Sequence, residues 1–181
     1  MSYTDLLVSW KARTTAEQTW IESLIGAAQA LGSSLQARLA PPALAFEIDG
    51  THHRLIDIIK LPPEDATELV TLSKANAEVS ADGVLAFGVS VAFKGVNSVG
   101  TAYYEQLYME AAVKSLGGST VYCVWDVEND APSNGSVWLG TETDMIIAIE
   151  NYFQEYLRID PRTDPNKSVR MGSLTYIIPK S

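Results

Sequence analysis

Three carboxylates at two-residue spacing, late in the chain, are the side chains best placed to do chemistry. Asp126, Glu128 and Asp130 share one face of a strand for as long as that strand continues. Such a group resembles a cation site or an acid–base pair. A calcium loop starting at Asp126 needs Gly at its sixth position and Glu at its twelfth, but the sequence has Ala131 and Val137 there. The pattern therefore predicts no metal site and is typical of a solvated acidic face.

The other reactive side chains lack partners at a useful spacing. His52 and His53 are neighbours on a predicted strand, so they point to opposite faces. Cys123 lies among alternating apolar residues and is predicted to be a small buried hydrophobe. The glycines of Gly95–Gly100 have phosphate-loop spacing, but Thr101 follows where lysine is required. We therefore expect no catalytic residue, no metal and no cofactor.

Two tryptophans flank the acidic stretch, and two more acids follow at the start of a predicted helix. Aromatic rings beside charges of one sign are common in protein-binding surfaces, because the rings supply buried area and the charges steer association. The sequence predicts such a partner-binding surface, made of Trp125, Asp126, Glu128, Asp130, Trp138, Glu142 and Asp144. In the alternative interpretation both tryptophans are core residues and the acids only rim a loop.

Negative charge is concentrated in the second half of the chain. The net charge is −9, from 13 Lys and Arg against 22 Asp and Glu. Residues 76–160 hold 12 of the acids and 3 of the bases, whereas residues 161–181 hold 1 acid and 4 bases. A field of this sign repels phosphate backbones and anionic lipids and attracts a basic protein. We expect no nucleic-acid or membrane partner, although acidity alone also keeps a protein dissolved.

Apolar spacing in the first half predicts one helix between short strands. Residues 3–10 alternate as a strand, and a capping box from Thr14 to Glu17 opens a helix over 14–31. Two hairpins should follow: residues 43–48 with 51–61 around Asp49-Gly50, and residues 74–80 with 85–93.

The second half should add two helices and the remaining strands. The expected elements are a helix over 104–116 ended by Gly117-Gly118, a strand at 121–127, a helix from Thr141 or Thr143 to Leu157, an irregular basic segment at 160–172 and a closing strand at 175–178. Together they predict an α+β fold. Its mixed or mainly antiparallel sheet would have about six to eight strands, with two or three helices packed on one face.

Length and composition predict one domain over residues 1–181. The chain has 181 residues, 46% of them hydrophobic, which supplies a core and excludes wholesale disorder. The single cysteine favours a reducing compartment, and no transmembrane or signal segment is recognised, so we expect a cytoplasmic protein. These motifs support no resemblance to a known family.

The acidic surface and the missing catalytic motifs favour a non-enzymatic binding protein that holds a basic protein partner. A bacterial toxin-neutralising immunity protein is the preferred role, and a secretion chaperone is an alternative. A small-molecule-binding or enzymatic domain is the runner-up, with a site formed by Tyr103, Tyr104, His52 or His53, and Asp126. An exposed carboxylate cluster without a strongly apolar pocket would argue against that runner-up. A third hypothesis is a structural subunit that assembles through sheet edges.

Overall fold

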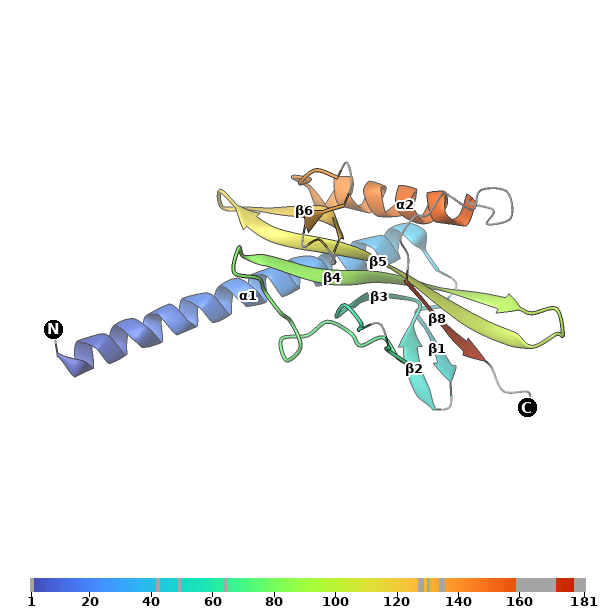
Figure 1. Ribbon diagram of the computed structural model, residues 1–181, viewed down its shortest axis with the longest axis horizontal. Helices are drawn as coiled ribbons and strands as arrows, with labels where there is room; N and C mark the ends of the chain where they lie inside the picture. Colours follow the sequence, from blue (N-terminus) through green and yellow to red (C-terminus); the bar gives the residue numbers. More distant parts are fainter. Residues whose placement is uncertain are drawn as a thin grey trace.

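The chain folds into two helices and two antiparallel sheets (Figure 1). A computed structural model describes residues 2–41, 43–48, 50–63, 65–126, 129, 131–133, 136–158 and 172–177. The elements are α1 (Tyr3–Leu39), β1 (Ala45–Ile48), β2 (Thr51–Arg54), β3 (Ile56–Ile59), β4 (Val84–Val96), β5 (Ala102–Leu116), β6 (Ser119–Asp126), β7 (Ala131–Pro132), α2 (Glu142–Arg158) and β8 (Gly172–Ile177). The predicted α+β class is confirmed.

The long strand β5 organises the larger sheet. This sheet has the order β3-β4-β5-β6-β7, and β8 also pairs with β5. One edge of β5 pairs with β4 over residues 102–114. The other edge is divided, because residues 111–116 pair with β6 and residues 103–108 pair with β8. The smaller sheet is the β1–β2 hairpin, which Figure 1 shows below the large sheet.

Both helices contribute to one core on a single face of the large sheet. Alternate residues of β4 and β5, such as Phe87 and Met109, are fully buried in this core. Leu24 of α1 and Ile149 of α2 lie in the same cluster. At Gly32, a Cβ atom would lie 2.6 Å from Cγ1 of Ile58, so the absence of a side chain lets α1 approach β3 closely. The N-terminal half of α1 extends beyond the sheet (Figure 1).

The predicted strand at 3–10 is wrong, because these residues form the start of α1. Ser2 caps the helix: its hydroxyl accepts from the Asp5 amide, and the Asp5 carboxylate accepts from the Ser2 amide. The capping box predicted at Thr14 is absent, since the Thr14 hydroxyl donates to the Trp10 carbonyl inside the helix. The predicted helix over 14–31 is therefore the middle of a longer one.

The predicted helix over 104–116 is also wrong, because these residues form β5. The Gly117-Gly118 pair does not end a helix but turns the β5–β6 hairpin. Both glycines have positive φ, 59° and 82°, which a two-residue type I′ turn requires. Pairing with neighbouring strands therefore decides the structure of this segment, even though Tyr104, Leu107 and Tyr108 have helical spacing.

Other predictions have mixed outcomes. The hairpin of β1 and β2, the strand β6 and the helix α2 are confirmed, and β8 confirms a closing strand. Residues 74–80 form no strand; Val79 makes an isolated bridge to Leu85, while β4 pairs with β3 and β5. The predicted basic segment at 160–172 lies outside the described residues apart from Gly172. Neither described helix has a stretch apolar enough to cross a membrane.

Candidate functional site

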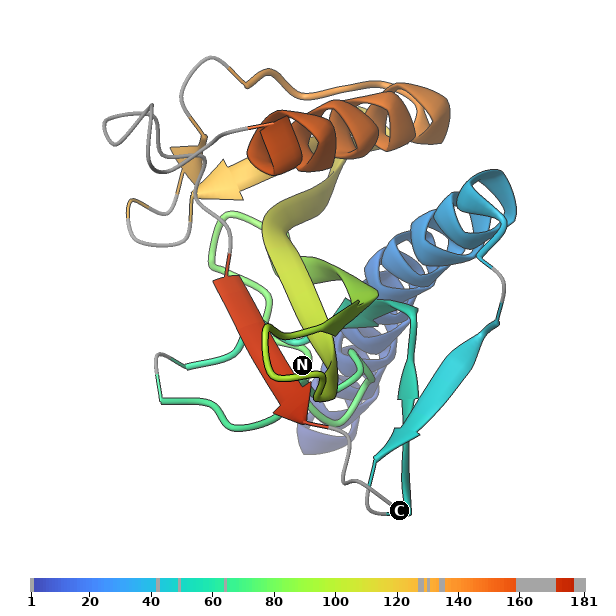
Figure 2. The same cartoon turned by 90° about the vertical axis from the view of Figure 1, so that its right-hand side faces the viewer.

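An apolar pocket of about 610 Å³ opens between the C-terminal ends of the two helices. Figure 2 looks toward these ends and shows the helices set apart. The floor is the part of β4 that runs past the N-terminal end of β3, since the first residue of β3, Ile56, is paired with Val91 and β4 continues to Val96. The apolar lining consists of Leu35, Leu39, Pro41, Ala43, Leu55, Ile56, Val91, Ala92, Phe93, Ile149, Phe153 and Leu157.

Regular spacing along each helix brings these side chains together. Leu35 and Leu39 are four residues apart on α1, and Ile149, Phe153 and Leu157 are four residues apart on α2. Residues at this spacing share one helix face. Each face begins in the buried core and becomes exposed toward the helix end, where Leu39 and Leu157 stand at the mouth. The pocket is thus an opening of the core, and its volume lies in the usual range for ligand sites.

The charged groups at the mouth leave a net positive charge. Nε of Arg38 lies 2.5 Å from Oε1 of Glu150, so these two charges compensate each other. The hydrogen bond to Glu150 raises the pKa of Arg38, so the guanidinium stays charged. Lys94 also lines the pocket, and among the described residues it has no carboxylate partner. Its Nζ lies 5.9 Å from the centre of the Tyr104 ring.

A stack of aromatic rings fixes Tyr104 at the pocket wall. The ring centres of Phe46 and Tyr104 are 4.0 Å apart with an interplanar angle of 16°, and Phe46 also stacks on His53 at 5.2 Å. His52 lies on the opposite side of β2, where its Nε2 is 3.7 Å from Oε2 of Glu47. The prediction that the two histidines face opposite ways is confirmed. Within the described residues, His, Cys, Asp and Glu form no group of three able to hold a metal ion.

The predicted partner-binding surface is divided in the structure. Trp125 is only 7% exposed and packs with Val84 and Ala112 on the sheet face opposite the helices. Trp138 is half-buried beside it, with the two ring centres 5.8 Å apart. The ammonium group of Lys114 lies 4.0 Å above the Trp138 ring. Trp125 is therefore a core residue, and a cation of the chain itself already covers Trp138.

The acids of that surface have local structural partners. Asp126 accepts hydrogen bonds from the Asn129 amide and side chain, at 3.2 and 2.9 Å, in the turn after β6. Thr141 caps α2, and Asp144 is its partner: the Thr141 hydroxyl accepts from the Asp144 amide and donates to the Asp144 carboxylate. Glu142 lies close enough to Tyr122 to raise the pKa of that phenol, after the larger effect of burial. Glu128 and Asp130 lie outside the described residues.

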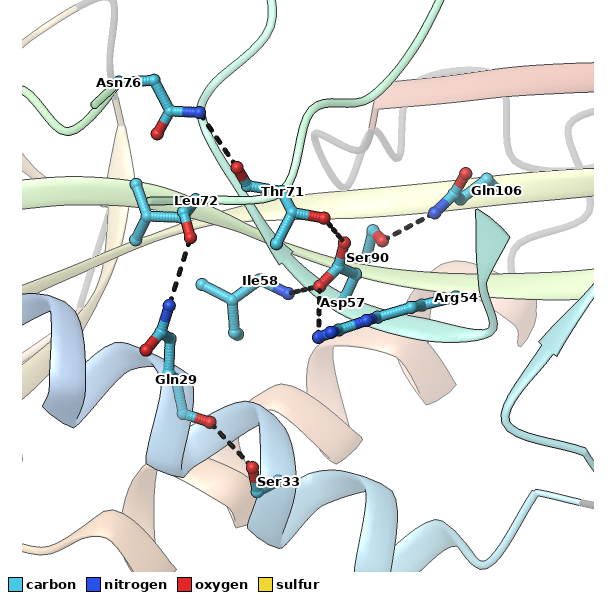
Figure 3. A network of polar contacts seen from close by, with 10 residues as sticks. All are labelled: Gln29, Ser33, Arg54, Asp57, Ile58, Thr71, Leu72, Asn76, Ser90 and Gln106. Atoms are coloured by element: carbon cyan, nitrogen blue, oxygen red, sulfur yellow. Dashed lines mark hydrogen bonds and ion pairs between the residues drawn. The ribbon is translucent and has the colours of Figure 1, made fainter. Parts of the chain in front are cut away.

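A second, polar pocket of about 320 Å³ surrounds Asp57 of β3 (Figure 3). Asp57 is 8% exposed, and its carboxylate accepts from the Thr71 hydroxyl and the Ile58 amide. Nη1 of Arg54 lies 3.6 Å from Oδ1 of Asp57. Burial raises the pKa of Asp57, and these contacts partly oppose that effect. The carboxylate is fully engaged by the chain, which indicates a structural role in holding residues 70–72 against β3.

Cys123 and Gln106 complete the buried polar groups of the sheet. Burial raises the pKa of the Cys123 thiol to about 11, so the thiol stays protonated and weakly nucleophilic at neutral pH. The Gln106 side chain donates to the Ser90 hydroxyl at 2.9 Å (Figure 3). Neither group opens into the apolar pocket.

Sequence reasoning found Tyr104 but missed most of this pocket. The lining residues come from five separate stretches of sequence, and each reads as ordinary core. The missed signal was the continuation of two helical stripes, to Leu39 and Leu157, beyond the point where the core covers them. No family model, curated protein or solved structure matches the chain, so its function is argued from this geometry.

Proposed function

We propose that the protein binds a small amphipathic molecule, with an apolar tail in the pocket between α1 and α2 and an anionic head group at Lys94. The observation that carries this proposal is the apolar pocket itself. A strongly apolar pocket is the feature that distinguishes a small-molecule-binding domain from a purely acidic protein-binding surface. A carboxylate attached to an alkyl chain is the simplest ligand of this kind.

The lining supports an apolar tail. Burial of alkyl surface against leucine, isoleucine and phenylalanine side chains is favourable by about 25 cal/mol per Å². Tyr104, Gln154, Lys94 and the Arg38–Glu150 pair are the polar groups around this apolar surface. Such polar groups orient a ligand and add specificity, while the apolar area supplies most of the affinity.

The charges support an anionic head group. Glu150 is neutralised by Arg38, so Lys94 determines the sign of the charge at the mouth. Because Lys94 is exposed, its contribution should be modest, and it should select between ligands that share a tail. Decanoate should therefore bind more tightly than decanol.

Two matched pairs of variants test this proposal by calorimetric titration with decanoate and decanol. Ala43→Trp places a ring in the pocket mouth and should abolish binding of both compounds, whereas Leu44→Trp adds a ring at the neighbouring residue that does not line the pocket. Lys94→Met should weaken decanoate about two- to fivefold and leave decanol unchanged, and Lys114→Met, beside Trp138, should change neither. Equal binding to wild type and Ala43→Trp would refute the pocket as the site.

The basic protein partner stays a prediction, as do the immunity and secretion-chaperone roles. Its support is the surplus of acids in residues 76–160 together with the exposed position of Asp144. Association with such a partner should slow in Asp144→Lys and at high salt, because steering by exposed charges is screened. An association rate that ignores both changes would remove the electrostatic argument.

A further inference from the structure

The N-terminal half of α1 is a stretch of helix without packing partners among the described residues. The buried residues of α1 begin at Leu24, and Trp20 is the first apolar side chain that packs against the core. In residues 3–19 every side chain is exposed or half-exposed. At 1.5 Å per residue this stretch is about 25 Å long. Figure 1 shows it extending from the body to the N-terminus.

One stripe of residues runs along the whole helix at alternating steps of three and four. In the packed half the stripe is apolar and contacts the core through Ile21, Leu24, Ala28, Leu31 and Leu35. The same steps, continued toward the N-terminus, reach Glu17, Thr14, Trp10, Leu7 and Tyr3. Alternating steps of three and four are the repeat by which two helices pack along a seam.

The free half of the stripe exposes large apolar side chains. Tyr3 is 80% exposed and Trp10 is 62% exposed, and Leu6 borders them at 53%. A contiguous apolar surface of this kind marks an interaction site. A helix of this length is marginal in water by itself, because most helical stability in proteins comes from packing an apolar face. The free half therefore requires a partner that covers Trp10.

We propose that residues 3–19 of α1 pair in antiparallel orientation with the same segment of a second copy of this chain. Two free segments of equal length cover each other in this arrangement and leave neither apolar stripe exposed. The heptad spacing then packs Leu7 of each copy against Trp10 of the other, and Tyr3 against Thr14. This inference does not depend on the proposed ligand pocket.

The position of Glu17 selects the antiparallel orientation. In a parallel pair the Glu17 side chains of the two copies would face each other across the seam, and like charges there are destabilising. In the antiparallel pair Glu17 lies beside the N-terminal turn of the second copy, where the helix dipole is positive. The antiparallel orientation therefore separates the two Glu17 carboxylates and places each of them near a helix N-terminus.

Sedimentation equilibrium of the full chain at tens of micromolar tests the pairing. The wild type should show the mass of two chains, and Trp10→Glu should show the mass of one. Val8→Glu is the matched control, because Val8 is 63% exposed on the same segment but lies outside the stripe. It should keep the two-chain mass. A wild type that sediments as one chain, or a Trp10→Glu variant that keeps the two-chain mass, would overturn the proposal.

Cysteine cross-linking tests the orientation. Leu7→Cys and Trp10→Cys chains, one of them carrying a mass tag, should form a mixed disulfide when combined under mild oxidation. Cys123 does not compete, because it is fully buried. Val8→Cys should form a disulfide at least tenfold more slowly than the mixture of Leu7→Cys and Trp10→Cys chains. Rapid self-linking of each single variant without the mixed product would show a parallel pair and contradict the proposed orientation.

Discussion

Nε of Arg38, near the C-terminal end of α1, lies 2.5 Å from Oε1 of Glu150 in the middle of α2. This ion pair joins the two helices at the mouth of the apolar pocket. The carboxylate side of the pair is mostly buried, with 18% of the Glu150 side chain exposed, and the guanidinium side is half-exposed. The pair cancels a negative charge that would otherwise repel an anionic ligand.

Removing the Glu150 charge should strengthen binding of a carboxylate. Glu150→Gln leaves the positive charge of Arg38 uncompensated at the mouth of the pocket, so the Kd of decanoate should fall about two- to fivefold. Glu155→Gln, on an exposed face of the same helix, removes the same charge away from the pocket and serves as the control. Calorimetric titration measures both. An unchanged or weaker affinity in Glu150→Gln would count against an anionic head group at this mouth.

Removing the Leu24 side chain should destabilise the fold strongly. Leu24 is 2% exposed and packs into the main core, so Leu24→Ala should lower the free energy of unfolding by roughly 2–5 kcal/mol. Leu116→Ala, at the exposed end of β5, should lower it by less than about 0.5 kcal/mol. Urea denaturation measures both changes. A loss below that smaller figure for Leu24→Ala would mean that α1 packs on the periphery.

The sequence predicted those elements whose local signals agree with their tertiary environment. In α2 the apolar stripe, the Thr141 cap and the burial all indicate a helix. In residues 3–10 and 104–116 the apolar residues satisfy helical and strand spacing at the same time. Pairing decided between them: β5 forms ladders with three other strands, whereas residues 3–10 have none. A ladder is a long-range contact, which local spacing does not encode.

The pocket was harder to predict than the fold. It exists because β4 continues past the N-terminal end of β3, so that β4 residues face the space between the C-terminal ends of α1 and α2. The helical stripes that continue to Leu39 and Leu157 indicate where each helix is apolar, but they do not tell that β3 leaves this part of β4 uncovered. The partner-binding surface stays a prediction, and the alternation that indicates a strand does not tell which sheet face holds Trp125.

Asp57 should make stability depend on pH in mildly acidic solution. Burial raises its pKa above the ordinary aspartate value of about 3.9, so the folded protein binds this proton more tightly than the unfolded chain does. The stabilising contribution is complete below that ordinary value and is lost as the pH rises through the raised pKa. The free energy of unfolding of the wild type, relative to Asp57→Asn, should decrease over this range. Urea denaturation between about pH 4 and pH 7 measures it, with exposed Asp82→Asn as the control. A relative stability that increases with pH would mean that the contacts of Asp57 outweigh its burial.

Cys123 should react only when the protein opens. Its pKa of about 11 and its complete burial keep the thiol protonated and inaccessible at pH 8. Labelling by an aromatic disulfide should therefore proceed at the rate of an opening of the sheet and accelerate in urea. The Val137→Cys variant carries an additional thiol at a position that is 66% exposed. This thiol should label within the mixing time of a manual experiment. Equally rapid labelling of Cys123 in native protein would contradict the burial of its side chain on β6.

Methyl NMR during titration with decanoate measures the occupancy of the pocket between α1 and α2 most directly. Saturable shifts are predicted for the methyl groups of Leu39, Ile149 and Leu157, which line the pocket. The methyl groups of Leu116 and Val137 are exposed and do not line the pocket, so their signals should not shift. Saturable shifts confined to the pocket would confirm the ligand site. Shifts spread evenly over exposed methyl groups, or none at all at millimolar decanoate, would contradict it.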